Sequence, residues 1–141
     1  MGLIASHDAY QGSYDGFGRW RRRIAELGGY PIIETDFYHG YLSPMTDIDF
    51  YSYPLRNFSG KWNKDERPKD PLIYLIIHHD DEGSFTPFMC RALADRLDGI
   101  LKDIDGREIS PDDCSRTLHS VTAQFIEGLR LAQRERRRLI F

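Results

Sequence analysis

Two short polar segments of the chain hold the residue types best suited to chemistry. They share one layout, in which an apolar run is followed by a histidine-aspartate turn and then by a hydroxyl residue that can cap a helix. The first segment runs from Leu3 to Ser13 and contains His7 and Asp8. The second runs from Leu72 to Thr86 and contains His78, His79, Asp80, Asp81 and Glu82. Histidine and carboxylate side chains bind divalent cations and transfer protons, so both segments are candidate sites.

Three chemistries fit such a cluster. The first is a divalent cation such as Zn, Mn or Fe that activates water for phosphoester hydrolysis. Its expected ligands are His7, Asp8, His78 and Asp80. The second is a general base formed by a histidine and a carboxylate without a metal. The third is a phosphate held by free N–H groups near Gly12–Ser13 and Phe85–Thr86, with support from arginine.

The two segments meet only if the strands before them lie side by side. Leu3 to Ala5 predicts a first strand, and the continuous apolar run Leu72 to Ile77 predicts a strand buried on both faces. If these strands are parallel, both polar turns lie at one carboxyl edge of the sheet, where ligands bind in open α/β proteins. Ile32 to Glu34 and Leu139 to Phe141 predict two further strands.

Helix signals complete the predicted fold. Ser13 is a predicted N-cap for a helix that ends at Leu27, before two glycines. Thr86–Pro87 and Ser110–Pro111 predict the starts of two more helices. Their expected core stripes are Phe17, Trp20, Ile24 and Leu27, then Leu118, Val121, Phe125 and Leu129. The sequence therefore predicts a single small layered α/β domain over residues 1–141, with a short sheet and about three helices.

The middle of the chain, residues 37–71, predicts an aromatic-rich insert or lid followed by a mobile connection from Lys61 to Pro71. Aromatic residues dominate cores and subunit interfaces, so we expect most of those in 37–62 to be structural and the protein to be a homo-oligomer. Tyr10 and Tyr14, beside the first polar turn, are better candidates for ligand contact.

Composition narrows the class of partner. The 141 residues carry a net charge of −3, which argues against nucleic acid as the partner. No apolar run approaches the roughly 18–20 residues of a membrane span, and the first residues do not form a signal peptide. We therefore expect a cytoplasmic protein whose two cysteines, Cys90 and Cys114, are free thiols.

Several motifs resemble those of a family of small uncharacterised phage, prophage and bacterial proteins. They are Ser6-His7-Asp8, Tyr10, Gly12-Ser13-Tyr14, Phe17, Arg19-Trp20-Arg21, His78 to Gly83, Leu93 to Leu97 and Thr122 to Leu129. The family has a His-Ser-Asp-x-Asp-Gly segment, and here Glu82 stands where its second Asp would be. The family has no established activity. The resemblance implies an accessory protein that interferes with a host function, in some such proteins by binding a nucleotide signal.

The leading hypothesis is therefore a phage-type accessory protein that binds a small phosphorylated or nucleotide-like ligand and sequesters a host defence signal. Its predicted site is His7, Asp8, Tyr10, Ser13, Tyr14, His78, Asp80 and Asp81. One alternative is a divalent-metal-dependent phosphoesterase that uses the same histidine and aspartate cluster. A second alternative is an inhibitor that contacts a host protein through the aromatic segment and has no small-molecule site.

Overall fold

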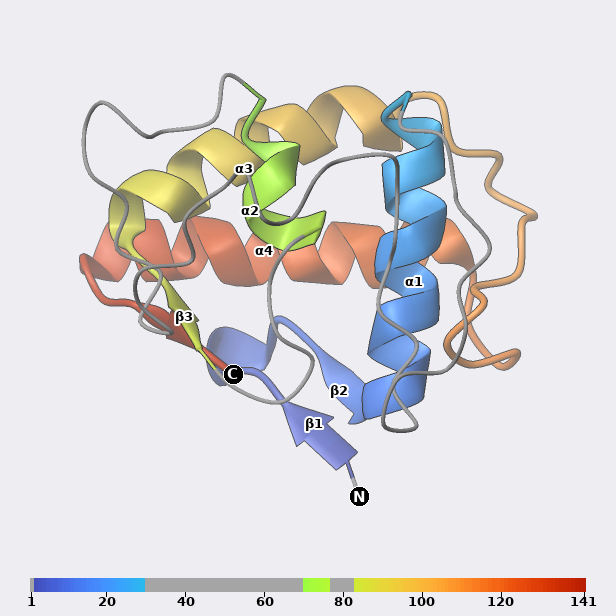
Figure 1. The fold of residues 1–141 in the computed structure, drawn as a ribbon, viewed down its shortest axis with the longest axis horizontal. Coiled ribbons are helices and arrows are strands. Elements are labelled where there is room, and N and C mark those ends of the chain that lie inside the picture. Colours follow the sequence, from blue (N-terminus) through green and yellow to red (C-terminus); the bar gives the residue numbers. More distant parts are fainter. Residues whose placement is uncertain (1, 30–69, 77–82) are drawn as a thin grey trace, which may run out of the picture.

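The part of the chain that the structure describes forms four α-helices and two small antiparallel sheets (Figure 1). The structure is a computed structural model that describes residues 2–29, 70–76 and 83–141. The elements are β1 (Gly2–Ile4), the 3-10 turn η1 (Ser6–Asp8), β2 (Gln11–Ser13), α1 (Tyr14–Leu27), α2 (Leu72–Ile76), β3 (Ser84–Phe85), α3 (Pro87–Leu101), α4 (Leu118–Glu135) and β4 (Leu139–Ile140). The predicted small α/β class is confirmed.

Helix α1 begins and ends where the sequence predicts. The Ser13 side chain accepts a hydrogen bond from the Gly16 N–H at 2.9 Å, and Gly28 is the C-cap. Serine at this position supplies an acceptor for one of the N–H groups that a helix start leaves without an intrahelical partner. Phe17, Trp20 and Ile24 are all fully buried, so the apolar stripe faces the core as predicted.

Helix α3 also follows its local signal, whereas α4 starts later than predicted. The Thr86 side chain accepts from the Met89 N–H at 3.2 Å, with Pro87 in the first turn. The predicted start of the last helix at Ser110–Pro111 is wrong, because Thr117 is the N-cap and accepts from the Ser120 N–H at 3.1 Å. Residues 102–117 are instead a loop that carries the isolated bridge Ile109–Thr117.

The predicted strand from Leu72 to Ile77 is wrong over its described part, because Leu72–Ile76 forms the helix α2. All five residues are buried, and an apolar run buried on every side looks the same in sequence whether it is a strand or a helix. The residues before it decide the outcome. The Asp70 carboxylate accepts from the Leu72 N–H at 2.9 Å, and the Asp70 carbonyl accepts from the Ile73 N–H at 3.1 Å.

The predicted parallel edge is therefore also wrong within the described residues. β1 pairs with β2 in antiparallel register, with Leu3 opposite Gly12, and β3 pairs with β4, with Phe85 opposite Leu139. The first and last predicted strands exist, but each joins a two-stranded ribbon, and α2 takes the place of the second partner. Among the described residues, the pairing of β1 with β2 gives the turn of His7 no parallel partner strand.

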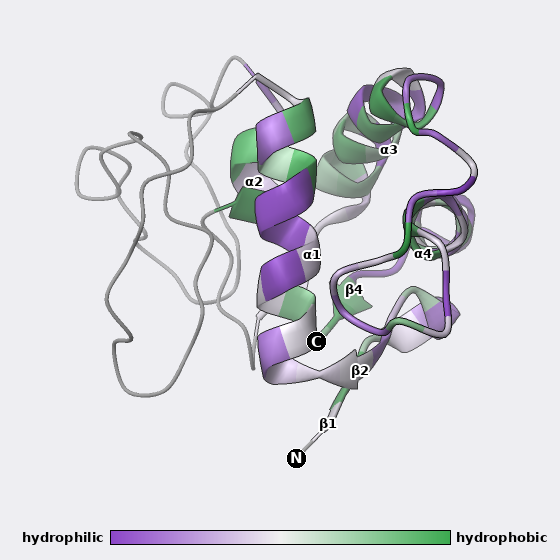
Figure 2. Ribbon diagram, turned by 90° about the vertical axis from the view of Figure 1, so that its right-hand side faces the viewer, coloured by the Kyte–Doolittle hydropathy of each residue, from purple (hydrophilic) through white to green (hydrophobic). Residues whose placement is uncertain are grey.

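The core lies where α1 crosses α4. The Trp20 ring is 4.8 Å from that of Phe125, and Phe17 lies 5.4 Å from Phe141, measured between ring centroids. Helix α3 runs along α4 and is tied to it by Arg130, which reaches carboxylates of α3 at 2.7 and 2.6 Å. Figure 2 shows α4 nearly end-on, with the mostly hydrophilic α3–α4 loop passing between it and α1.

Several predictions of the sequence lie outside the described residues. These are the strand Ile32 to Glu34, the aromatic segment and most of the predicted mobile connection, and the residues His78, Asp80 and Asp81. Asp70 and Pro71, at the end of that connection, directly precede α2, and Asp70 pairs with Arg96 at 3.1 Å. Within the described ranges, no helix combines the length and the apolar content needed to cross a membrane.

Two helical glycines, one packed against Ala9 and one facing open space, test the packing of α4. A Cβ atom on Gly128 would lie 2.4 Å from the Ala9 Cβ and 2.6 Å from its Cα, whereas a Cβ on Gly99 of α3 would meet no atom within 4 Å. We expect Gly128→Ala to lower the free energy of unfolding by about 1–3 kcal/mol through overpacking. Gly99→Ala, its matched control, should raise it by up to about 1 kcal/mol through helix propensity. Urea denaturation measures both, and equal effects would contradict the contact between η1 and α4.

Candidate functional site

The loop 102–117 folds back on itself and places a compact turn against the start of α1. The Ser110 N–H donates to the Arg116 carbonyl at 2.9 Å, and the Leu118 N–H donates to the Glu108 carbonyl at 2.8 Å. These two bonds close residues 110–116 into a hairpin-like loop. Its tip carries Pro111, Asp112 and Asp113, residue types that favour turns.

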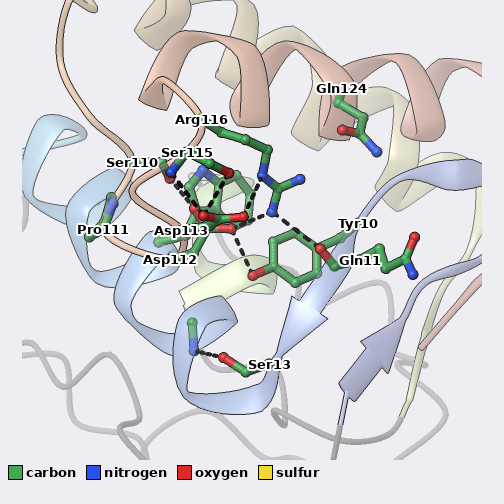
Figure 3. A network of polar contacts seen from close by, with 12 residues as sticks. Tyr10, Gln11, Ser13, Ser110, Pro111, Asp112, Asp113, Ser115, Arg116 and Gln124 are labelled. Atoms are coloured by element: carbon green, nitrogen blue, oxygen red, sulfur yellow. Dashed lines mark hydrogen bonds and ion pairs between the residues drawn. The ribbon is translucent and has the colours of Figure 1, made fainter.

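Asp112 is the centre of a polar network at this turn (Figure 3). Its carboxylate accepts from the Tyr10 hydroxyl at 3.0 Å, from the Arg116 guanidinium at 2.7 Å and from the Ser110 hydroxyl. Only 1% of the Asp112 side chain is exposed. A carboxylate can be buried only with charge compensation and hydrogen bonds, and here three donors from two parts of the chain supply both.

Tyr10 serves this network as a hydrogen-bond donor. The residue is 1% exposed, its ring stacks on Trp20 and packs at a tilt against Phe17, and the Arg116 guanidinium lies 5.9 Å from the ring centroid. Burial and the neighbouring Asp112 charge raise the pKa of the Tyr10 phenol well above its ordinary value. The hydroxyl therefore keeps its proton and anchors the buried carboxylate from below.

The start of α1 lies close to this turn because residue 16 is glycine. A Cβ atom on Gly16 would lie 2.8 Å from Ser13 Oγ and 3.1 Å from the Asp112 carbonyl oxygen. A glycine at this position therefore lets the helix start pack directly against the loop. Arg19, one turn further along α1, donates through Nε to the Pro111 carbonyl at 2.8 Å and ties the helix to the tip of the loop.

Between these elements is a pocket of about 580 Å³. It is lined by Gly12, Ser13, Arg19, Ser110, Pro111, Asp112, Asp113, Cys114 and Arg116. Its volume is within the range of about 300–1,000 Å³ that is usual for small-molecule sites. The lining mixes backbone at the start of a helix, two guanidinium groups, two carboxylates and an exposed thiol, so it is suited to a polar ligand.

The five predicted site residues that the structure describes lie in three places. Ser13 lines the pocket, and Tyr10 holds Asp112 in its wall. Tyr14 is partly buried and packs against the core. His7 and Asp8 are in η1 and contact α4 instead, since His7 bonds Glu135 at 3.0 Å and the Asp8 carbonyl accepts from Gln124 at 2.8 Å.

The structure describes two of the four predicted metal ligands, His7 and Asp8. His78 and Asp80 lie outside the described residues, so the four-ligand site stays a prediction. Of its other two ligands, His7 already uses both ring nitrogens, with Nδ1 at 2.8 Å from Ser6 Oγ and Nε2 at 3.0 Å from Glu135. Among the residues that the structure describes, no group of three or more His, Cys, Asp or Glu side chains could hold a metal ion.

Sequence reasoning missed Arg19, Ser110, Asp112, Cys114 and Arg116 as site residues. Four of them are in the loop that was assigned to the last helix from the Ser110–Pro111 signal. The signal that points to them is the turn-forming Pro-Asp-Asp tip followed by an arginine four residues after the first aspartate. The contact of this loop with Tyr10 is not visible in the sequence, because 102 residues separate the partners.

No protein family, no curated protein and no solved structure matches this chain. The resemblance to small phage and bacterial proteins therefore stays a prediction. Any functional conclusion depends on the geometry of the site itself.

A double-mutant cycle tests the buried network. We expect Tyr10→Phe to lower the free energy of unfolding by about 1 kcal/mol, because one of three donors is lost. Asp112→Asn should lower the free energy of unfolding by about 2–3 kcal/mol, since it removes the negative charge that Arg116 and two hydroxyl groups contact. The double variant should show a coupling of about 1 kcal/mol. Asp113→Asn removes the same charge from an exposed position in the same loop and should change the free energy of unfolding far less than Asp112→Asn does. Strict additivity would contradict the bond between Tyr10 and Asp112.

Alkaline pH gives a second test of Tyr10. Its pKa is raised in the folded state above the ordinary value of 10.0, so its contribution to stability is complete below pH 10 and is lost as the pH rises further. The difference in unfolding free energy between the native protein and Tyr10→Phe should therefore shrink above pH 10. Urea titrations of both proteins at several pH values measure this difference. A constant difference across that range would show that the phenol is not held protonated.

Proposed function

We propose that this chain is a binding protein for a small phosphorylated ligand, whose phosphate lies in the pocket between the start of α1 and the α3–α4 loop. The observation that carries the proposal is the arrangement of Arg19. Its Nε is bound to the Pro111 carbonyl, which fixes the guanidinium at the wall of the pocket. Its two terminal nitrogens make no hydrogen bond to another described residue. A fixed guanidinium with unused donors is a good partner for a phosphate.

The two guanidinium groups and two carboxylates that line the pocket carry no net charge, so the pairing of these charges decides where an anion can bind. The Asp112 charge is compensated by Arg116 at 2.7 Å. The Asp113 carboxylate, whose pKa the hydrogen bonds from Ser115 hold below its ordinary value, keeps its negative charge and lies 3.7 Å from Arg116 Nε. Both lining carboxylates therefore lie beside Arg116, and Arg19 is the lining cation without a carboxylate partner among the residues that the structure describes.

The start of α1 adds further donors. The first N–H groups of a helix have no intrahelical acceptor, and the aligned peptide dipoles place partial positive charge at this end. The Ser13 side chain accepts from the Gly16 N–H, and Ser13, the N-cap of α1, itself lines the pocket together with Gly12. Phosphate binding at a helix start next to an arginine follows from these two effects together.

The size of the pocket and the resemblance suggest the kind of ligand. About 580 Å³ exceeds the space that a bare phosphate needs and is enough for a nucleotide-like molecule. Small phage accessory proteins interfere with host functions, some by binding nucleotide signals. We therefore extend the proposal to sequestration of a phosphorylated, nucleotide-like signal, with release of the ligand chemically unchanged.

Cys114 offers a direct test of occupancy. It is exposed and lines the pocket, whereas Cys90 is fully buried and burial raises the pKa of its thiol to about 11. A thiol reagent such as Ellman's reagent should therefore modify Cys114 first. Inorganic pyrophosphate or adenosine monophosphate in the pocket should slow that modification in a saturable way. Cys114→Ser should abolish the fast phase of thiol modification, which would identify Cys114 as the thiol that the assay follows.

The matched variants are two arginine replacements. Arg19→Gln removes the fixed charge and should weaken protection of Cys114 by either probe at least about 10-fold, as expected for a lost charge-assisted bond. Arg91→Gln removes the same charge from an exposed position on α3 and should leave protection unchanged. The absence of protection at millimolar concentrations of both probes, or equal protection in the Arg19→Gln variant, would overturn the proposed site.

The two alternatives stay predictions that rest on other residues. The metal-dependent phosphoesterase needs His78 and Asp80, and the protein-interaction inhibitor needs the aromatic segment 37–62, all outside the described residues. Each alternative has an outcome that the binding protein does not share. The phosphoesterase would hydrolyse a phosphoester, and a chelator would stop that hydrolysis. The inhibitor would still bind its host protein after the pocket is altered. Neither has an observation in the described residues that favours it over the pocket.

A further inference from the structure

The turn η1 carries a second arrangement that the pocket does not use. It is a continuous chain of hydrogen bonds through Ser6, His7 and Glu135, located where the N-terminal turn meets the end of α4 and β4 (Figure 1). Ser6 Oγ lies 2.8 Å from His7 Nδ1, and His7 Nε2 lies 3.0 Å from Glu135 Oε2. None of these three residues lines the pocket.

The direction of each hydrogen bond follows from the chemistry of the groups. The Ile140 backbone N–H, which can only donate, bonds Ser6 Oγ at 2.8 Å. An ionised Glu135 can only accept, so His7 Nε2 carries the proton. In the neutral imidazole, Nδ1 is then an acceptor, and it faces the Ser6 hydroxyl. The chain therefore consists of a serine hydroxyl that donates to an unprotonated ring nitrogen, with the ring oriented by a carboxylate.

The fold holds this chain under constraint. His7 and Asp8 have φ angles of 59° and 53°, a left-handed backbone that non-glycine residues rarely adopt. Three residues along one stripe of α4 hold the turn there: Gln124 donates to the Asp8 carbonyl, Gly128 packs on Ala9, and Glu135 bonds His7. Strained residues kept in place by their surroundings occur preferentially at functional sites.

We propose that Ser6 is a nucleophile activated by His7, with Glu135 as the positioning residue, and that the substrate is an acyl ester. A nucleophile within hydrogen-bond reach of a base that a third group orients is the recurring arrangement of covalent hydrolysis. His7 is 11% and Glu135 44% exposed at the side chain, and Ser6 is partly exposed, so the three residues lie at the surface of the described fold.

The reaction has two balanced steps. The Ser6 oxygen bonds to the acyl carbon, the bond from that carbon to the alcohol oxygen breaks, and the Ser6 proton passes through His7 Nδ1 to the departing alkoxide. Water then attacks the acyl–Ser6 ester with His7 again as base, which releases the carboxylic acid and restores the serine. Both steps need only the substrate and water, because His7 holds the proton between them.

Covalent labelling with a fluorophosphonate tests the proposal on the intact chain. The Ser6 oxygen should displace fluoride and form one stable phosphonyl ester, which peptide mass spectrometry places on Ser6. Ser6→Ala should abolish that label, and Ser120→Ala, which removes an exposed hydroxyl at the start of α4, should leave it unchanged. Labelling of native Ser6 that is no faster than labelling of Ser120 would overturn the proposal.

Two further variants separate a catalytic role from a structural one. His7→Gly suits the left-handed backbone, so it removes the imidazole without forcing the turn. It should slow labelling at least about 100-fold, and added imidazole should restore part of the rate. Glu135→Gln, at a largely exposed position, should slow labelling at least about 10-fold. Wild-type rates in either variant would show that the hydrogen-bond chain only holds the turn. Arg19→Gln should leave labelling unchanged, which keeps this test separate from that of the pocket.

Discussion

Trp20 lies at the crossing of α1 and α4, where its ring packs on Phe125 and its Nε1 donates to the Thr122 hydroxyl at 3.1 Å. Both partners of that hydrogen bond are fully buried, so the crossing is fixed by shape and by one satisfied polar pair. Successive residues of a helix point about 100° apart, and the neighbours of Trp20 are thereby directed to two other elements. Arg19 reaches the loop at Pro111, and Arg21 reaches the Leu75 carbonyl at the end of α2 at 3.0 Å.

Arg21 is a charged side chain held in the interior at this crossing. It is fully buried, its guanidinium lies 4.8 Å from the Phe17 ring centroid, and burial lowers its pKa to about 9. At neutral pH it is still charged, so its hydrogen bond to Leu75 and its contact with the aromatic face offset the loss of water around it. Arg19 and Arg21 are two residues apart in sequence. Arg21 makes a buried contact and Arg19 lines the pocket, because the helix turns by about 200° between the two positions.

The short segment from Ser6 to Ser13 supplies both proposed sites. At its beginning, Ser6 and His7 face the end of α4, and at its end, Tyr10 and Ser13 face the α3–α4 loop. The segment can do both because η1 and β2 are each only three residues long and are held by partners more than a hundred residues away. A loop fixed by rigid elements is a common position for functional groups, since its side chains are placed precisely while its backbone can take unusual conformations.

The sequence by itself determined the mixed α/β class, the starts of α1 and α3 and the buried stripes of α1 and α4, because caps and periodicity act over a few neighbouring residues. It also marked His7, Tyr10 and Ser13 as residues of interest. Only the tertiary structure decided that Leu72–Ile76 is a helix, since a fully buried run has no polar face to reveal its period. It alone joined Tyr10 to Asp112 and His7 to Glu135, because contacts between distant residues depend on how the helices cross and leave no pattern in a single sequence.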